Sequence, residues 1–139
     1  MRGELVVEFL RRKKRFHELI LEAWSGLEFD VDQLVTRQFG LDCDYRDKKV
    51  QFLLGSSFEQ KLQFLKKVGV VNSKEFHIIK GFQERRNRFF HTLGTAEMAI
   101  LTKEEREQTI DEAVKVTKLG LDLVWRAPPV NGPKSLPKS

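Results

Sequence analysis

The sequence predicts an all-α fold, an up-and-down helical bundle of about five helices. All four prolines (Pro128, Pro129, Pro133 and Pro137) lie in the last dozen residues, and proline disrupts helix interiors. The residues before them carry no clear alternating strand pattern. With 139 residues, 40% hydrophobic and 32% charged, the chain suits one domain with its own core. We therefore expect a helical domain over 1–126 and a disordered Pro/Lys-rich tail over 127–139.

Glycines indicate where the helices end. Each of five glycines follows a stretch with helical apolar spacing, where a left-handed C-terminal cap would fall. They are Gly26, Gly40, Gly55, Gly69 and Gly94.

Capping-box pairs indicate where helices begin, because each side chain of such a pair satisfies a free backbone amide. The pairs are Ser56 with Glu59, Asn72 with Glu75, and Thr102 with Glu105. Together these signals predict helices over about 3–25, 30–39, 57–68, 73–91 and 103–126. The stretch 41–55 stays open, since Tyr45 to Leu54 would also form a short helix.

Apolar stripes on the longer helices support a bundle, because such stripes are buried only against one another. The stripes are Phe9, Phe16 and Ala23 on the first helix, Ile78, Phe82 and Phe89 on the fourth, and Ile110, Val114 and Leu121 on the last.

Composition narrows the class of protein. The single Cys43 excludes a disulfide within the chain and a cysteine-cluster zinc site. No apolar run is long enough to span a membrane, and the basic run Arg11–Arg15 interrupts any signal peptide. We expect a cytoplasmic protein that is not bound to membranes. The net charge of +5 favours polyanionic partners such as RNA, although many basic proteins bind none.

The segment Arg86–His91 is the most distinctive stretch. In a helix Asn87 and His91 are four residues apart and share a face. Arg86 and His91 are five apart and diverge by roughly 140°. They converge only if the long arginine bends or the helix ends at His91, an end that Gly94 makes plausible.

The three side chains suit attack on a phosphodiester. Histidine exchanges protons near neutrality, and arginine offers a forked positive charge that matches phosphate oxygens. Asparagine orients an imidazole or holds a ribose hydroxyl. RNA supplies its own nucleophile, the 2′-hydroxyl, so neither a metal nor another cofactor is expected. The alternative is that His91 is a helix cap or a surface residue.

A longer pattern resembles the HEPN superfamily, most closely its mannitol-repressor-like and related uncharacterised branches. The resemblance covers about residues 57–92. It is carried by Phe58-Glu59-Gln60-Lys61-Leu62, Val68-Gly69-Val70-Val71, Phe76, Ile79 and Arg86-Asn87-Arg88-Phe89-Phe90-His91.

The resemblance implies a helical bundle that pairs through the motif helices, and active members that are metal-independent ribonucleases in defence, toxin–antitoxin and RNA-processing settings. Carried over by position, His91 would be the general base or acid and Arg86 the phosphate binder. Asn87 would be the polar residue after the arginine. The same branch includes regulators, so the motif alone makes catalysis possible and no more.

Two hypotheses follow. The first is a metal-independent endoribonuclease or RNA-binding protein, a homodimer with RNA as substrate and a protein such as an antitoxin as a further partner. The second is a non-catalytic regulator or adaptor acting through protein–protein contacts, in which Arg86 and Asn87 are dimer or capping contacts.

Further basic residues are candidates for RNA binding. Arg85 and Arg88 flank the motif, and Arg12 and Lys13 lie in the basic run of the first predicted helix. For Lys13 the competing interpretation is a lysine whose stem covers apolar surface while its charge stays in water.

The segment Asp42–Asp47 has spaced carboxylates but lacks the glycine and the terminal glutamate of an EF-hand loop. We interpret it as a polar turn.

Overall fold

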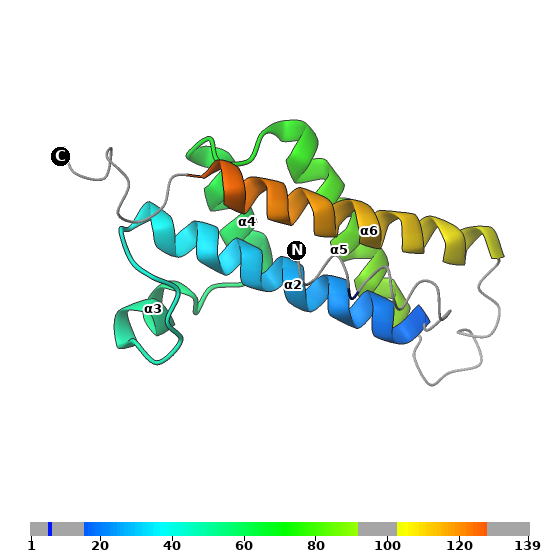
Figure 1. Ribbon diagram of the computed structural model, residues 1–139, viewed down its shortest axis with the longest axis horizontal. Coiled ribbons are helices and arrows are strands. Elements are labelled where there is room, and N and C mark those ends of the chain that lie inside the picture. Colours follow the sequence, from blue (N-terminus) through cyan, green and yellow to red (C-terminus); the bar gives the residue numbers. More distant parts are fainter. Residues whose placement is uncertain (1–5, 7–15, 92–102, 128–139) are drawn as a thin grey trace.

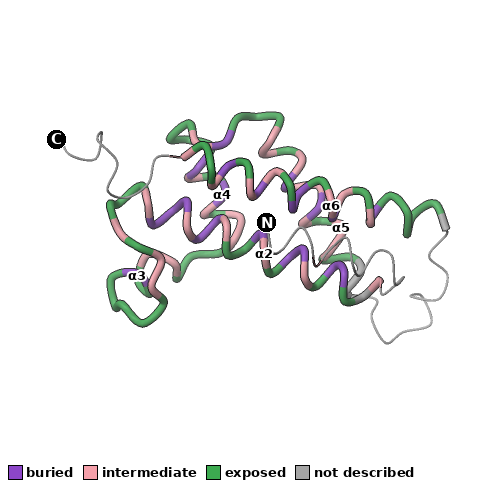
Figure 2. The backbone as a smooth tube through the Cα atoms, viewed as in Figure 1, coloured by how far each residue is buried: buried purple, intermediate pink, exposed green. Residues whose placement is uncertain are grey.

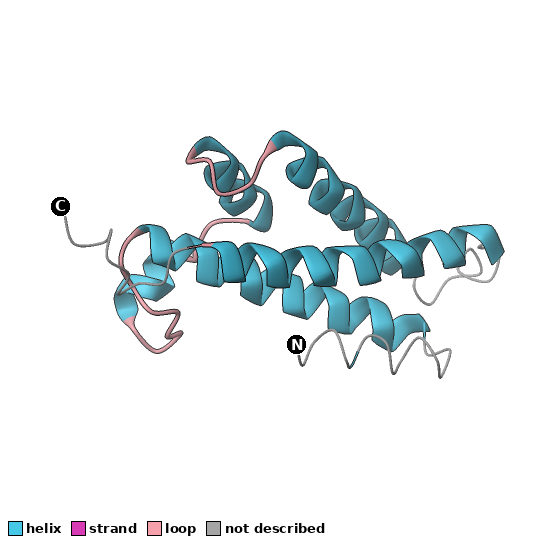
Figure 3. Cartoon of the chain, turned by 45° about the horizontal axis from the view of Figure 1, so that its top comes forward, coloured by secondary structure: helices cyan, strands magenta, loops and turns pink. Residues whose placement is uncertain are grey.

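A computed structural model describes residues 6, 16–91 and 103–127 of the chain, and this part contains helices and no strand. The all-α prediction is confirmed (Figures 1 and 3). The predicted tail, apart from Ala127, lies outside the described residues, as do Arg12 and Lys13. With the labels of Figure 1, the helices are α2 (Phe16–Gln38), α3 (Lys48–Leu53), α4 (Phe58–Lys67), α5 (Ser73–His91) and α6 (Lys103–Arg126).

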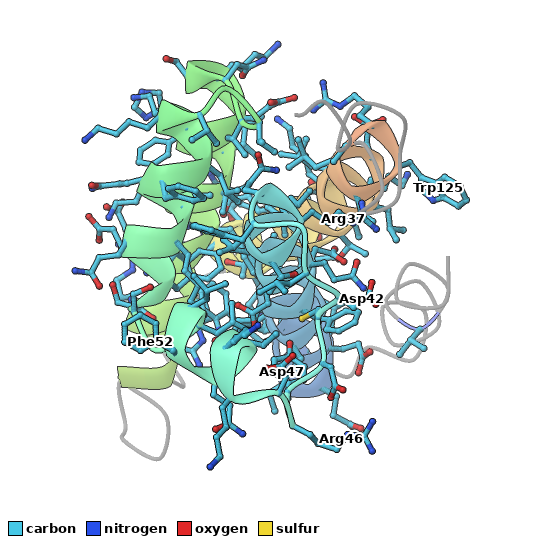
Figure 4. The ribbon with its side chains drawn as sticks, turned by 90° about the vertical axis from the view of Figure 1, so that its left-hand side faces the viewer. Arg37, Asp42, Arg46, Asp47, Phe52 and Trp125 are labelled. Atoms are coloured by element: carbon cyan, nitrogen blue, oxygen red, sulfur yellow. The ribbon has the colours of Figure 1, made fainter. Side chains whose placement is uncertain are left out.

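The helices form two layers. The long helices α2 and α6 run side by side in the same direction, and α4 and α5 form an antiparallel hairpin that packs on them (Figures 1 and 3). Arg37 reaches from α2 to α6, where its Nη1 donates to the Val124 carbonyl oxygen at 2.8 Å (Figure 4). Within the hairpin, the Lys80 Nζ lies 2.6 Å from the Glu59 carboxylate.

The core lies between the layers, where the buried faces meet (Figure 2). Phe82 of α5 is its largest fully buried side chain, and the predicted stripe residue Ala23 is buried as well. On α6 the predicted stripe is displaced: Ile110, Val114 and Leu121 are only half-buried. The buried hydrophobic side chains described on that helix are Ala113, Val116 and Leu123.

The predicted helix break at Gly26 is wrong. One helix, α2, runs from Phe16 to Gln38, so the expected helices over 3–25 and 30–39 are not separate there. A glycine inside a helix costs about 1 kcal/mol relative to alanine, but the residues after it, Leu27 and Val31, are buried. Burying each such side chain stabilises the helix by about 1.5–3 kcal/mol, which outweighs the glycine.

The left-handed caps at Gly40 and Gly69 are confirmed, with φ of 70° and 85°. Gly55, by contrast, is not in the left-handed region, and Gly94 lies outside the described residues.

The capping boxes are found with one shift. Asn72 and Glu75 exchange the expected hydrogen bonds at 3.0 and 2.8 Å. The pair predicted at Ser56 is formed one residue later, by Ser57 and Gln60. This register places Phe58 against Trp24 of α2, with ring centroids 4.6 Å apart. The Thr102 pair lies outside the described residues.

The open stretch 41–55 contains the short helix α3, which Asp47 caps by accepting from the Lys49 amide at 2.8 Å. The segment before it is the polar turn that the sequence predicts, with the Asp44 carboxylate bound to Arg46 at 3.1 Å (Figure 4).

A buried polar cluster attaches this loop to the bundle. Asp32 of α2 is 8% exposed. It receives the Lys61 ammonium at 2.8 Å and the Tyr45 hydroxyl at 3.0 Å. Burial raises the pKa of the neighbouring Cys43 thiol, which disfavours its thiolate form. Each charge in the cluster has a partner, as a buried charge requires.

Asp30 of α2 lies against Gly120 of α6. A side chain at Gly120 would collide with the Asp30 carboxylate, so only glycine fits there without a shift. Burial in this contact raises the pKa of Asp30 from 3.8 to about 6. In the folded protein the contact therefore favours the protonated carboxyl.

We expect Asp30→Asn to stabilise the protein at neutral pH by about 2 kcal/mol. The pKa of Asp30 is higher in the folded than in the unfolded chain. The stabilising contribution of Asp30 to the free energy of unfolding is therefore complete below about pH 4 and is lost as the pH rises through about 6. Urea unfolding from pH 4 to 8 measures this, with the exposed Glu28→Gln on the same helix as control. If both variants follow the pH dependence of the parent, the account of this contact is wrong.

None of the helices in the described ranges is both long and apolar enough to cross a membrane.

Candidate functional site

The predicted site lies at the C-terminal end of α5, where Arg86 packs on the edge of the core. Trp24 of α2 is 6% exposed and lies between Phe58 and Phe82, whose centroids are 4.6 and 6.4 Å away. The Arg86 guanidinium carbon lies 4.7 Å from the centre of the Trp24 ring. This is a cation–π contact, which attracts the guanidinium to the edge of the core.

Arg86 and Asn87 are brought together. The Arg86 Nη1 donates to the Asn87 Oδ1 at 3.0 Å. Arg86 is half-buried, whereas Asn87 is exposed. The guanidinium therefore spans the boundary between the core and the solvent, with its Nε buried and one terminal nitrogen on a surface amide.

His91 is the last residue of α5 and lies one helical turn beyond Asn87. Residues 92–102, where the sequence predicts the end of this helix, lie outside the described residues. The placement of the His91 side chain lies outside what the structure describes.

The two flanking arginines differ in their surroundings. The Arg85 Nε binds the Glu112 carboxylate of α6 at 2.7 Å, and both side chains are mostly buried. Arg85 thus joins α5 to α6, and its charge is balanced within the bundle. Arg88 is exposed. Of the two, Arg88 is the one that presents its charge at the surface.

Sequence reasoning missed the part that Trp24 plays. Trp24 adjoins the predicted stripe residue Ala23, but nothing in the spacing indicated that a motif residue 62 positions later would contact its ring. The buried pair Asp32–Lys61 was missed for the same reason, because it joins positions far apart in the sequence.

Across the ranges that the structure covers, no group of three or more His, Cys, Asp or Glu side chains is arranged to hold a metal ion.

Comparison with known proteins adds no relative: no family model, no curated protein and no solved structure matches the chain.

Proposed function

We propose that the protein is a HEPN-type, metal-independent endoribonuclease, or an RNA-binding relative of one. The observation that carries the proposal is the Arg86–Asn87 contact, which fixes a guanidinium at the solvent boundary one turn before His91. A guanidinium held this way is suited to bind a phosphate without a large loss of side-chain entropy.

In the proposed reaction, His91 removes the proton from a ribose 2′-hydroxyl. The 2′-oxygen attacks the adjacent phosphorus, a bond forms between them, and the bond from phosphorus to the 5′-oxygen breaks. The departing 5′-oxygen takes a proton from an imidazolium, and a 2′,3′-cyclic phosphate remains. Arg86 neutralises the charge that builds on the phosphate oxygens, and Asn87 holds the guanidinium or the ribose in position.

One imidazole can serve as base and then as acid only in sequence. A second His91, supplied by another copy of the chain, would let both proton transfers occur together. We therefore propose a homodimer in which the α5 ends of two copies face a common cleft. The same proposal includes a role as a toxin, in defence or in RNA processing. If the protein is a toxin, its further partner would be an antitoxin-like protein.

We expect Arg86→Ala to lower the rate of RNA cleavage in EDTA by about 10²–10³, the cost of removing one group that stabilises transition-state charge. Arg86→Lys keeps the charge but loses the planar fork, so we expect an intermediate rate. The measurement is single-turnover cleavage of a labelled RNA, with melting temperatures taken on the same samples. Equal rates for the parent and both variants would remove Arg86 from the site.

A second candidate function is a non-catalytic regulator or adaptor, and one observation favours it. Arg86 and Arg85 both make contacts that hold the bundle together, on Trp24 and on Glu112. If that is their whole role, Arg86→Ala lowers the free energy of unfolding by about 0.5–2 kcal/mol and the parent cleaves no RNA. The same experiment therefore separates the two candidates.

A further inference from the structure

The two layers of the bundle carry opposite charge. The hairpin over residues 57–91 has eight Lys and Arg against three Asp and Glu, a net charge of +5. In the other layer, α2 has five acidic residues against one basic, and α6 has six against five. A polyanion approaching this bundle is attracted to the hairpin and repelled by α2.

The outward face of α5 collects part of this charge. Lys74, His77, Glu84 and Arg88 are exposed, and together with Gly81, which lies between His77 and Glu84, they recur at helical spacing on the side opposite the buried Ile79 and Phe82. Over the described ranges Lys74 makes no ion pair, and neither does Lys67 at the adjoining end of α4. Both lysines are exposed. Their charges are therefore available to an external anion.

Gly81 lies at the centre of this face. A glycine inside a helix weakens it relative to alanine, so its presence calls for a reason. Among the described residues nothing lies within 4 Å of a Cβ placed there, so packing inside the bundle does not require it. The open space at Gly81 leaves room on this face for a molecule outside the bundle to come close to the helix backbone.

We propose that the outward face of α5 is a track for single-stranded RNA. In this arrangement phosphates lie on Lys67, Lys74 and Arg88, the strand passes closest at Gly81, and it leads to the Arg86–His91 end. The track from Lys74 to Arg88 is about 21 Å long at 1.5 Å per residue. This inference rests on the proposed function, since it names the path by which the substrate reaches that site.

The first experiment measures binding of a fluorescent 12-nucleotide oligo(U) by anisotropy at several salt concentrations. We compare the double variant Lys67→Gln/Lys74→Gln with Lys48→Gln/Lys49→Gln, which removes two exposed lysines from α3. For single strands each phosphate contact contributes a salt slope of about 0.7. For the track variant, Lys67→Gln/Lys74→Gln, the slope of the logarithm of the binding constant against the logarithm of the salt concentration should therefore be smaller by about 1.4, and the affinity at 0.1 M salt should be about 25-fold lower. The α3 variant should bind RNA as the parent does. Equal losses in the two variants would overturn the track.

The second experiment tests Gly81 with a matched glycine. Gly81→Gln and Gly26→Gln both place a helix-forming side chain where no described atom lies within 4 Å. We expect both melting temperatures to rise and only Gly81→Gln to weaken RNA binding, by about tenfold or more as the strand is pushed away. If Gly81→Gln binds RNA as tightly as Gly26→Gln, close approach at Gly81 is excluded.

Substrate length separates the track from the catalytic proposal. The single phosphate of a dinucleotide must occupy the Arg86–His91 end, so none is left for Lys67 or Lys74. The track variant should cleave a dinucleotide as the parent does and show a raised KM, with unchanged kcat, on the 12-nucleotide RNA.

The possible outcomes separate the two proposals. If the KM of the track variant on the longer RNA is unchanged, the track is overturned while the cleavage site stands. If the parent binds RNA along the track and cleaves nothing, the nuclease fails. If the parent binds no RNA, both are overturned.

Discussion

Replacing Phe82 by alanine is expected to lower the free energy of unfolding by about 3–5 kcal/mol, the usual cost of removing a buried aromatic ring. Phe82 has no exposed surface and packs on Trp24, the residue that also supports Arg86. The cavity would open where α5 meets α2. Equilibrium unfolding in urea measures the loss.

The control for this prediction is Phe52→Ala. Phe52 projects from α3 with 87% of its surface exposed (Figure 4), so its removal should change the free energy of unfolding by no more than about 0.5 kcal/mol. The same loss of stability in both variants would contradict the core described above.

The hairpin was predictable because its signals are local. Helix starts depend on residues three apart, such as Asn72 and Glu75, and the turn between α4 and α5 depends on one left-handed glycine, Gly69. Gly26 carries the same local signal as Gly69, yet α2 passes through it. The difference lies in tertiary burial on either side of the glycine, which a single position does not reveal.

The site was predictable as a stretch of residues but not as a set of contacts. Arg86, Asn87 and His91 were chosen for their chemistry, and the positions of α5 follow from the helical period. That Arg86 stacks on Trp24 while Arg85 binds Glu112 depends on which helices lie beside α5. Those neighbours are set by the packing of α2 and α6, whose direction no local pattern indicates.

The contact with Trp24 changes how Arg86 variants should be interpreted. Because the guanidinium both covers the core and faces Asn87, a loss of activity in Arg86→Ala can arise from a weakened bundle. His91 offers a second test, since in the proposed reaction it transfers the protons itself.

We expect His91→Ala to reduce RNA cleavage by about 10²–10⁴, the usual contribution of a general base or acid. The matched control is His77→Ala, because His77 is an exposed histidine on the same helix, ahead of the motif that begins at Arg86. Within the described ranges, His77 makes a ring contact with Phe76, with centroids 5.7 Å apart, and it lies away from the motif, so its replacement should leave the chemical step unchanged.

The most direct test of the site is therefore single-turnover cleavage of one labelled RNA in EDTA by the parent, His91→Ala and His77→Ala, each shown to be folded by its melting temperature. Cleavage by the parent and by His77→Ala, with a rate for His91→Ala at least about 100-fold lower, is the predicted result. Cleavage at the same rate by all three proteins, or no cleavage by a folded parent, would contradict a ribonuclease site at the end of α5.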